Sequence, residues 1–227
     1  MTAEEAEVTG DSRQASWLLL FLSSLFLSVA SAGERDFGTS MNLFLKATLN
    51  DDWFLLSRSN LATRDDNENL FLGYTGVTLG RQLDPNWSLR VGFRKAGIKL
   101  SGDWYGEDRP FLEAYYAENL NGFRLSNRAR AEWRMFGHRD DDVRLRNEVV
   151  LQMPWKLTPL ELQPYFEDEV FYSVENGKVE ANWLGTGLSW RPAKGTKLKA
   201  GYRWNRFRLG NSWQDRDMLV LGISLFY

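Results

Sequence analysis

Long stretches of the chain alternate apolar and polar side chains with a period of two. Successive side chains of a β-strand point to opposite faces of the sheet, so this period indicates strands and assigns each residue to a face. In segment 123–135 one face carries Phe123, Leu125, Ala129, Ala131, Trp133 and Met135, and the other carries Arg124, Ser126, Arg128, Arg130, Glu132 and Arg134. In segment 143–153 the faces carry Val143, Leu145, Val149, Leu151 and Met153 against Arg144, Arg146, Glu148 and Gln152.

Turn signals at 50–52, 84–86, 119–122, 153–159, 176–177 and 192–195 separate further segments rich in aromatic, β-branched and alternating residues. We expect strands near 41–49, 53–61, 70–81, 86–95, 110–118, 122–136, 143–153, 161–173, 178–190, 197–208 and 216–227. Long strands joined by short connections describe an up-and-down meander. The sequence therefore predicts an all-β, antiparallel transmembrane β-barrel of ten to twelve strands.

An even strand number is expected, because bacterial single-chain barrels of the outer membrane have one. Eleven candidate segments conflict with that rule, so either 41–49 is not a full strand or a twelfth lies in 33–40. Loop length suggests the sides. The short connections at 50–52, 84–86, 119–122 and 192–195 are expected at the periplasmic end, and the longer polar ones at 62–69, 101–109, 137–142 and 209–215 outside.

The last strand of the chain resembles the closing strand of bacterial outer-membrane barrels, which the barrel-insertion machinery reads. Its apolar face runs to a terminal aromatic residue and carries Leu219, Leu221, Ile223, Leu225 and Tyr227. We expect these residues to form the insertion signal.

The N-terminal segment has the features of an export signal. The apolar run 17–30 is shorter than a membrane-spanning helix, and Ala30-Ser31-Ala32 offers a small-x-small cleavage site. We expect residues 1–32 to be a signal peptide and residues 33–227 to form one barrel domain in the outer membrane of a Gram-negative cell. An uncleaved membrane anchor is the alternative.

Composition narrows the possible functions. The formal charge of −2 argues against a nucleic-acid partner, and the absence of cysteine removes disulfides and thiolate metal sites. Mean hydropathy is low at −0.42, although aromatic residues make up 14% of the chain. Alternating lipid-facing and lumen-facing residues produce such a low average. We expect no metal or other cofactor, and outer-membrane lipid, including lipopolysaccharide, as the surroundings.

The charged faces are the main candidate site. An arginine on the lipid face costs about 2–4 kcal/mol at the bilayer midplane, so the arginines are expected to line the lumen. The expected network consists of Arg128, Arg130, Glu132, Arg134, Arg144, Arg146, Glu148, Glu167 and Glu169. Such groups either pair into a plug or edge a narrow polar pore or binding site. Asp168 falls on an apolar face, and 183–190 and 203–208 change phase, so a bulge is expected at each.

The segment 164–171 (PYFEDEVF), downstream of RARAEWR and RLRNEV, resembles the domain of unknown function 2490 family. Those bacterial proteins are regarded as outer-membrane barrels without an established activity. The resemblance covers nearly the whole chain after residue 33 and implies the fold and the location, but no chemistry.

Two alternatives of other classes remain open. A hydrolase at the extracellular rim would use His138, the single histidine, with rim carboxylates such as Asp140, Glu107 or Asp108. No serine lies near His138 in sequence, and we expect no catalytic residue. A soluble periplasmic barrel carrying a lipophilic ligand would need the reverse orientation, with apolar side chains inside. Tryptophan and tyrosine residues are expected in two interfacial girdles, with Trp53, Trp87, Trp155 and Trp190 at the periplasmic end and Trp104, Tyr172 and Trp213 at the outer end.

Overall fold

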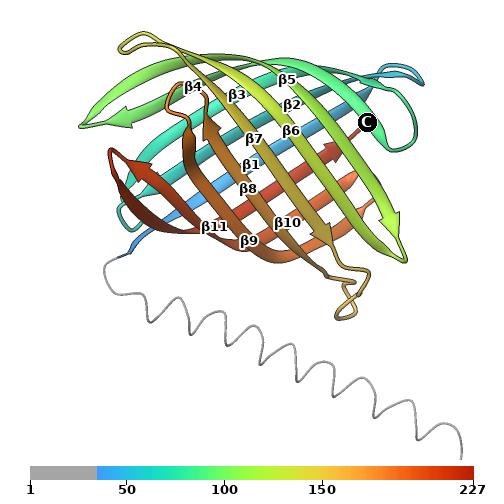
Figure 1. The fold of residues 1–227 in the computed structure, drawn as a ribbon. Helices are drawn as coiled ribbons and strands as arrows, with labels where there is room; N and C mark the ends of the chain where they lie inside the picture. Colours follow the sequence, from blue (N-terminus) through green and yellow to red (C-terminus); the bar gives the residue numbers. More distant parts are fainter. Residues whose placement is uncertain (1–34) are drawn as a thin grey trace, which may run out of the picture.

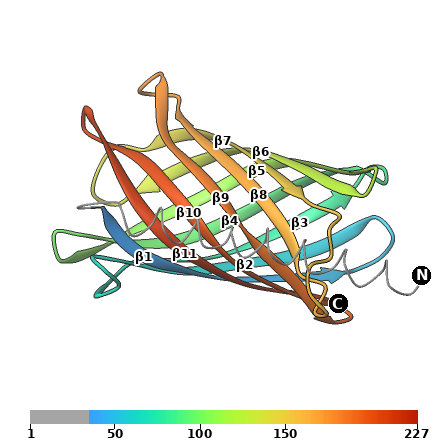
Figure 2. The ribbon, with the colours of Figure 1, turned by 90° about the horizontal axis from the view of Figure 1, so that it is seen from below.

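Each alternating segment forms a β-strand in the computed structural model, which describes residues 35–227 (Figure 1). The strands are β1 (Asp36–Thr48), β2 (Trp53–Arg64), β3 (Asn69–Gln82), β4 (Trp87–Leu100), β5 (Asp103–Leu120), β6 (Phe123–Phe136), β7 (Asp142–Gln152), β8 (Gln163–Ser173), β9 (Lys178–Ala193), β10 (Thr196–Leu209) and β11 (Ser212–Phe226). Each strand pairs with its neighbours in sequence, and β1 pairs with β11, so the sheet closes into a barrel (Figure 2). The predicted all-β barrel of ten to twelve strands is confirmed.

The expected even strand number is wrong, because the barrel has eleven strands. Residues 36–40 belong to β1 itself, which is a full strand, so the described residues 35–40 contain no separate twelfth strand. In a meander with an odd number of strands, the first and the last strand run in the same direction. β1 and β11 therefore pair in parallel, from Asp36 opposite Arg216 to Lys46 opposite Phe226. This seam leaves the sheet without an open edge.

The connections alternate between two rims of the barrel. The C-terminal rim carries 49–52, 83–86, 121–122, 153–162, 194–195 and Tyr227, and the N-terminal rim carries 65–68, 101–102, 137–141, 174–177, 210–211 and the start of β1. The expectation of long loops at 101–109 and 209–215 is wrong. Each region contains a two-residue hairpin turn, at 101–102 and at 210–211, and its other residues belong to the flanking strands. Ser101 and Gly102 both have positive φ, 50° and 100°, as such tight turns require. The longest connection, 153–162, lies on the rim expected to have short turns, so loop length does not assign the sides.

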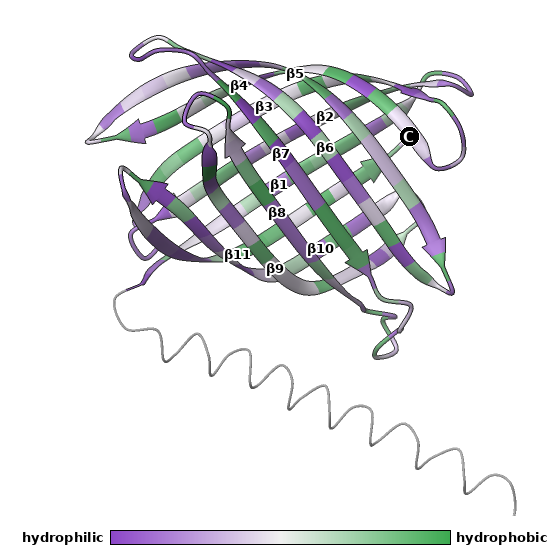
Figure 3. Ribbon diagram, in the orientation of Figure 1, coloured by the Kyte–Doolittle hydropathy of each residue, from purple (hydrophilic) through white to green (hydrophobic). Residues whose placement is uncertain are grey.

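The outer wall of the barrel is apolar, and much of the interior is charged. Hydrophilic and hydrophobic residues alternate along the strands in Figure 3. Leu112, Val77 and Trp133 point outward with exposures of 65%, 62% and 57%. Among residues 35–227 no helix is long and apolar enough to cross a membrane. The aromatic residues expected in girdles lie near the two rims: Trp53, Trp87, Trp155 and Trp190 at the C-terminal rim, and Trp104, Tyr172 and Trp213 at the N-terminal rim.

The bulges expected at Asp168, 183–190 and 203–208 are not found. Register shifts occur instead near Ala62, near Phe171 and near Thr196, and Asp168 keeps its outward position. Segment 183–190 keeps one register against β10, which places Trp183 inside the barrel. The lumen accommodates this aromatic ring because the guanidinium of Arg203 stacks on it at 4.3 Å.

Candidate functional site

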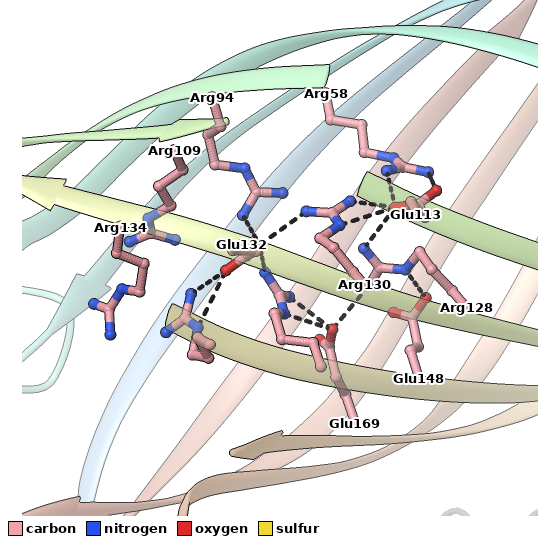
Figure 4. A network of polar contacts seen from close by, with 12 residues as sticks. Arg58, Arg94, Arg109, Glu113, Arg128, Arg130, Glu132, Arg134, Glu148 and Glu169 are labelled. Carbon is pink, nitrogen blue, oxygen red and sulfur yellow. Dashed lines mark hydrogen bonds and ion pairs between the residues drawn. The ribbon is translucent and has the colours of Figure 1, made fainter. Parts of the chain in front are cut away.

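Glu113 on β5 is the centre of the first ionic cluster in the lumen (Figure 4). Its carboxylate lies 2.6 Å from the guanidinium of Arg130, 2.7 Å from that of Arg90 and 3.1 Å from that of Arg58. Arg128 approaches it at 3.6 Å. The Glu113 side chain has no exposed surface, so four arginines from three strands surround one buried carboxylate. This arrangement satisfies the carboxylate fully and forces four like charges together.

Glu132 on β6 is the centre of the second cluster. Its carboxylate lies 2.6 Å from Arg144, 2.8 Å from Arg146 and 3.1 Å from Arg130. Arg94 stands 3.9 Å away. The antiparallel register of β6 and β7 places Glu132 directly opposite Arg144. Because Arg130 touches both Glu113 and Glu132, the two clusters form one network.

Glu169 and Glu148 extend the network toward β8. Glu169 accepts hydrogen bonds from Arg128 at 2.9 Å and from Arg146 at 2.7 Å. Glu148 accepts from Arg128 at 2.8 Å. Glu169 ties the two arginine-rich strands to β8, and Glu148 on β7 ties β7 to β6. Paired in this way, the long side chains fill one side of the lumen.

Guanidinium groups outnumber carboxylates in this network. Seven arginines, Arg58, Arg90, Arg94, Arg128, Arg130, Arg144 and Arg146, contact the four carboxylates Glu113, Glu132, Glu148 and Glu169. Aromatic faces stabilise several of the arginines: Arg90 stacks on Tyr115 at 3.9 Å, and Arg94 on Tyr74 at 4.0 Å. The network is therefore electropositive, and stacking on aromatic rings stabilises part of its excess positive charge.

A smaller cluster lies closer to the N-terminal rim. Glu107 lies 2.5 Å from Arg109 and 2.6 Å from Arg134, and its side chain is almost fully buried. Arg134 also approaches Asp142 at 3.4 Å. In the adjacent β8–β9 turn, the pKa of Glu175 is lowered because the side chain of Asp142 hydrogen-bonds to it. Acidic groups thus gather at this end of the barrel.

A cavity of about 210 Å³ remains inside the barrel between the network and the β1–β11 seam. The seam side of its wall is uncharged, with Asn42, Val220, Gly222 and Ser224. The charged residues of the wall are Arg58, Arg94, Arg128, Arg146, Lys199 and Arg203 against Glu148, Glu167 and Glu169. Six basic groups thus face three acidic ones, an excess of three positive charges.

A second cavity, of about 400 Å³, opens at the C-terminal rim beneath the 153–162 connection. Its charged residues are Arg124, Lys156 and Arg191 against Glu161. Gln152 lines this cavity and accepts a hydrogen bond from the amine of Lys197 at 2.9 Å. This cavity at the C-terminal rim is therefore basic, with three basic side chains and one acidic side chain in its wall.

The structure places all nine residues of the expected charge network inside the barrel. Eight of them join the two clusters or the N-terminal cluster, and Glu167 instead pairs with Lys199 at 2.7 Å beside the cavity. Sequence reasoning missed Glu113, which pairs with four arginines, as Glu132 does. The sequence contained a signal for this residue: Glu107, Arg109 and Glu113 are separated by even numbers of residues and therefore share one face of β5.

The remaining candidate residues lie apart from this network. Leu219, Leu221 and Ile223 face outward from β11 and are exposed, and Tyr227 closes the chain at the C-terminal rim with an N–H bond to the carbonyl of Lys46. Leu225 lies on the same face at the end of β11. Their role as an insertion signal stays a prediction. The expected signal peptide, residues 1–32, lies outside the described residues.

The hydrolase alternative gains no supporting cluster from the placement of these residues. His138 lies in the 137–141 turn, with its ring 4.3 Å from that of Tyr105. Glu107, considered as a rim partner, instead lies inside the barrel with Arg109 and Arg134. Within residues 35–227 no group of three or more His, Cys, Asp or Glu side chains is placed to hold a metal ion. The orientation needed by a carrier of lipophilic ligands is the reverse of the one observed.

Comparison with known proteins identifies a family but no characterised relative. Neither a curated protein nor a solved structure matches the chain. A family model described as "Protein of unknown function (DUF2490)" matches residues 37–216, which include all the residues of the charge network.

Proposed function

The chain belongs to the DUF2490 family, and we propose that it is an outer-membrane β-barrel whose lumen binds or passes small anionic solutes. The charge network holds the barrel in shape on one side. The basic cavity on the other side provides the site. Both features use the same inward-facing residues of neighbouring strands.

The outer wall supports a location in a lipid bilayer. Leu112, Val77 and Trp133 offer large apolar side chains to the surroundings, and closure of the sheet satisfies the backbone groups of every strand. Only helices and closed barrels meet that requirement in hydrocarbon. Tryptophan residues at both rims fit the interfacial girdles of such barrels. Export through an N-terminal signal belongs to the same proposal.

The charge of the cavity wall is the observation that carries the anion preference. Six basic groups against three carboxylates leave a positive site, and basic residues lining a pore favour anions. Arg203 contributes most directly, since its Nε donates to Asn205 at 2.8 Å and no carboxylate pairs with it among the described residues. The basic cavity at the C-terminal rim extends the same preference to one mouth of the barrel.

The size of the cavity restricts the solute. A volume of about 210 Å³ suits a small solute, and the filled side of the lumen leaves no wide aqueous channel. We therefore expect a conductance well below that of a general porin. A small carboxylate or an inorganic anion fits the charge and the volume.

Planar-bilayer recording with a salt gradient across the membrane tests the proposal. The purified barrel should give small conductance steps, with a reversal potential of the sign expected for anion selectivity. Arg203→Gln should shift that potential toward the value expected for cation selectivity. Arg206→Gln is the matched control, because Arg206 lies on the same strand, faces outward and pairs with Asp215. Absence of steps together with absence of anion-dependent stabilisation of the barrel would refute the proposal and leave a plugged structural barrel.

A further inference from the structure

Four polar residues form a row on the outer wall of β6 to β9: Asn127, Asn147, Asp168 and Asn182. The strand period that places Ala129 and Val149 outside also places these residues there. Asn147 and Asp168 are exposed, and Asn127 and Asn182 are half-buried. Apolar side chains such as Leu145 and Phe166 surround the row on this wall.

The row is only partly satisfied by its own hydrogen bonds. The side chains of Asn127 and Asn147 bond to each other at 3.0 and 3.3 Å, and Asn182 donates to Oδ1 of Asp168 at 2.5 Å. Among residues 35–227 no hydrogen bond joins the Asn127–Asn147 pair to the Asp168–Asn182 pair. Oδ2 of Asp168 and one N–H of Asn147 stay available to a partner. An available acceptor thus stands one strand from an available donor.

The row crosses the middle of the barrel wall rather than a rim. Asn147 is the central residue of β7 and Asp168 the central residue of β8, and each strand has 11 residues. Apolar Leu145 and Phe166 lie exposed on either side. If the barrel spans a membrane, as proposed above, these polar groups face the hydrocarbon core, where no water satisfies them.

We propose that the β6–β9 wall is the interface of a homodimer in the membrane. A two-fold axis parallel to the barrel axis and passing between β7 and β8 places Asn147 of each copy against Asp168 of the other. The amide then donates to the available carboxylate oxygen twice, once in each direction. The same operation brings Asn127 toward Asn182. Each amide already donates twice within its own copy, so a bond across the interface would replace the 3.4 Å bond that one of them makes to a strand carbonyl, of Glu148 or of Glu169. A surface that complements itself under this operation fits a second copy of the chain.

The shape of the wall agrees with such an interface. Ala129 is small and allows close approach of two backbones, as small residues do at membrane interfaces. β7 and β8 are also the shortest strands of the barrel, and a neighbouring copy would reduce the mismatch between this wall and the bilayer. Leu145, Val149 and Phe166 would pack around the polar contacts.

Cysteine cross-linking tests the interface in the otherwise unchanged protein, because the native chain has no cysteine. Val149→Cys, beside the proposed axis, should form a disulfide-linked dimer in proteoliposomes. Val77→Cys, on the outer wall of β3, is the control and should not. A cross-link at Val149 to a different membrane protein in cells, with a monomer after purification, would overturn the proposal.

Substitution of the polar row gives a second readout. Asp168→Leu should raise the dimer dissociation constant in lipid about tenfold, since two symmetry-related hydrogen bonds are lost. Ser59→Leu, which removes an outward hydroxyl bonded to Thr75, should leave it unchanged. Flotation with liposomes separates the two proposals. A barrel that does not float refutes the membrane location, whereas one that floats but stays monomeric refutes the dimer alone.

Discussion

Glu113→Gln should destabilise the barrel more than replacement of any exposed carboxylate. The substitution removes the negative charge that Arg58, Arg90 and Arg130 share, and the Glu113 side chain has no exposed surface. Five hydrogen bonds from these arginines end on its two oxygens. After the change Arg58 and Arg90 lose the carboxylate with which they pair, and Arg130 keeps Glu132. Removing one partner of a buried ion pair costs about 3–5 kcal/mol, and the number of partners places this site at the upper end.

Reversible urea unfolding, followed by tryptophan fluorescence in vesicles or detergent, measures the change in the free energy of unfolding. Glu161→Gln is the control, because the Glu161 side chain is 64% exposed and pairs only with Lys156. That exposed pair contributes about 0–1 kcal/mol. Adding Arg130→Gln to Glu113→Gln removes a positive charge from the group that lost Glu113, so the double variant should lose less than the sum of the single losses. A loss below about 1 kcal/mol for Glu113→Gln would refute the reasoning.

Three further substitutions test the lumen, the packing and the outer wall. Glu132→Gln should cost about 3–5 kcal/mol in the same assay, since its carboxylate is equally buried; a neutral result would show that the second cluster is not stabilising. Gly201→Ala should cost about 1–3 kcal/mol, because its Cβ would lie 2.4 Å from the hydroxyl of Tyr165, whereas Gly106→Ala meets open space and should be tolerated. Leu112→Arg should cost about 2–4 kcal/mol in lipid vesicles, and no cost there would argue against burial of this wall in hydrocarbon.

The strands and their faces could be predicted because they depend on local alternation. The period of two in β6 and β7 fixes both the strands and the inward direction of Arg130 and Arg146, whatever the rest of the chain does. The extents of the strands were harder to predict. The polar residues 103–109 read as a loop, but they continue β5 beyond the apolar band to a turn at Ser101 and Gly102.

Features that depend on closure could not be predicted in the same way. The parallel β1–β11 seam follows from the total number of strands, which no single segment contains. Arg90 and Arg130 lie directly opposite Glu113 on the neighbouring strands β4 and β6. Arg58 reaches Glu113 from β2, three strands away, and no sequence spacing reports that contact. At Asp168 the sequence suggested an irregularity that the strand does not have. Its polar character suggested a bulge, whereas the strand is regular there and Asn182 on the neighbouring strand bonds to it.

Spin labels on adjacent residues of β11 test most directly which side of the barrel wall faces lipid. Leu219 points outward and is 40% exposed, whereas Val220 lines the lumen cavity. In vesicles, a label on Leu219→Cys should collide with membrane-soluble oxygen and not with a water-soluble nickel chelate, and a label on Val220→Cys should be shielded from lipid. Equal accessibility of both labels to the chelate, or lipid contact at position 220, would contradict the account.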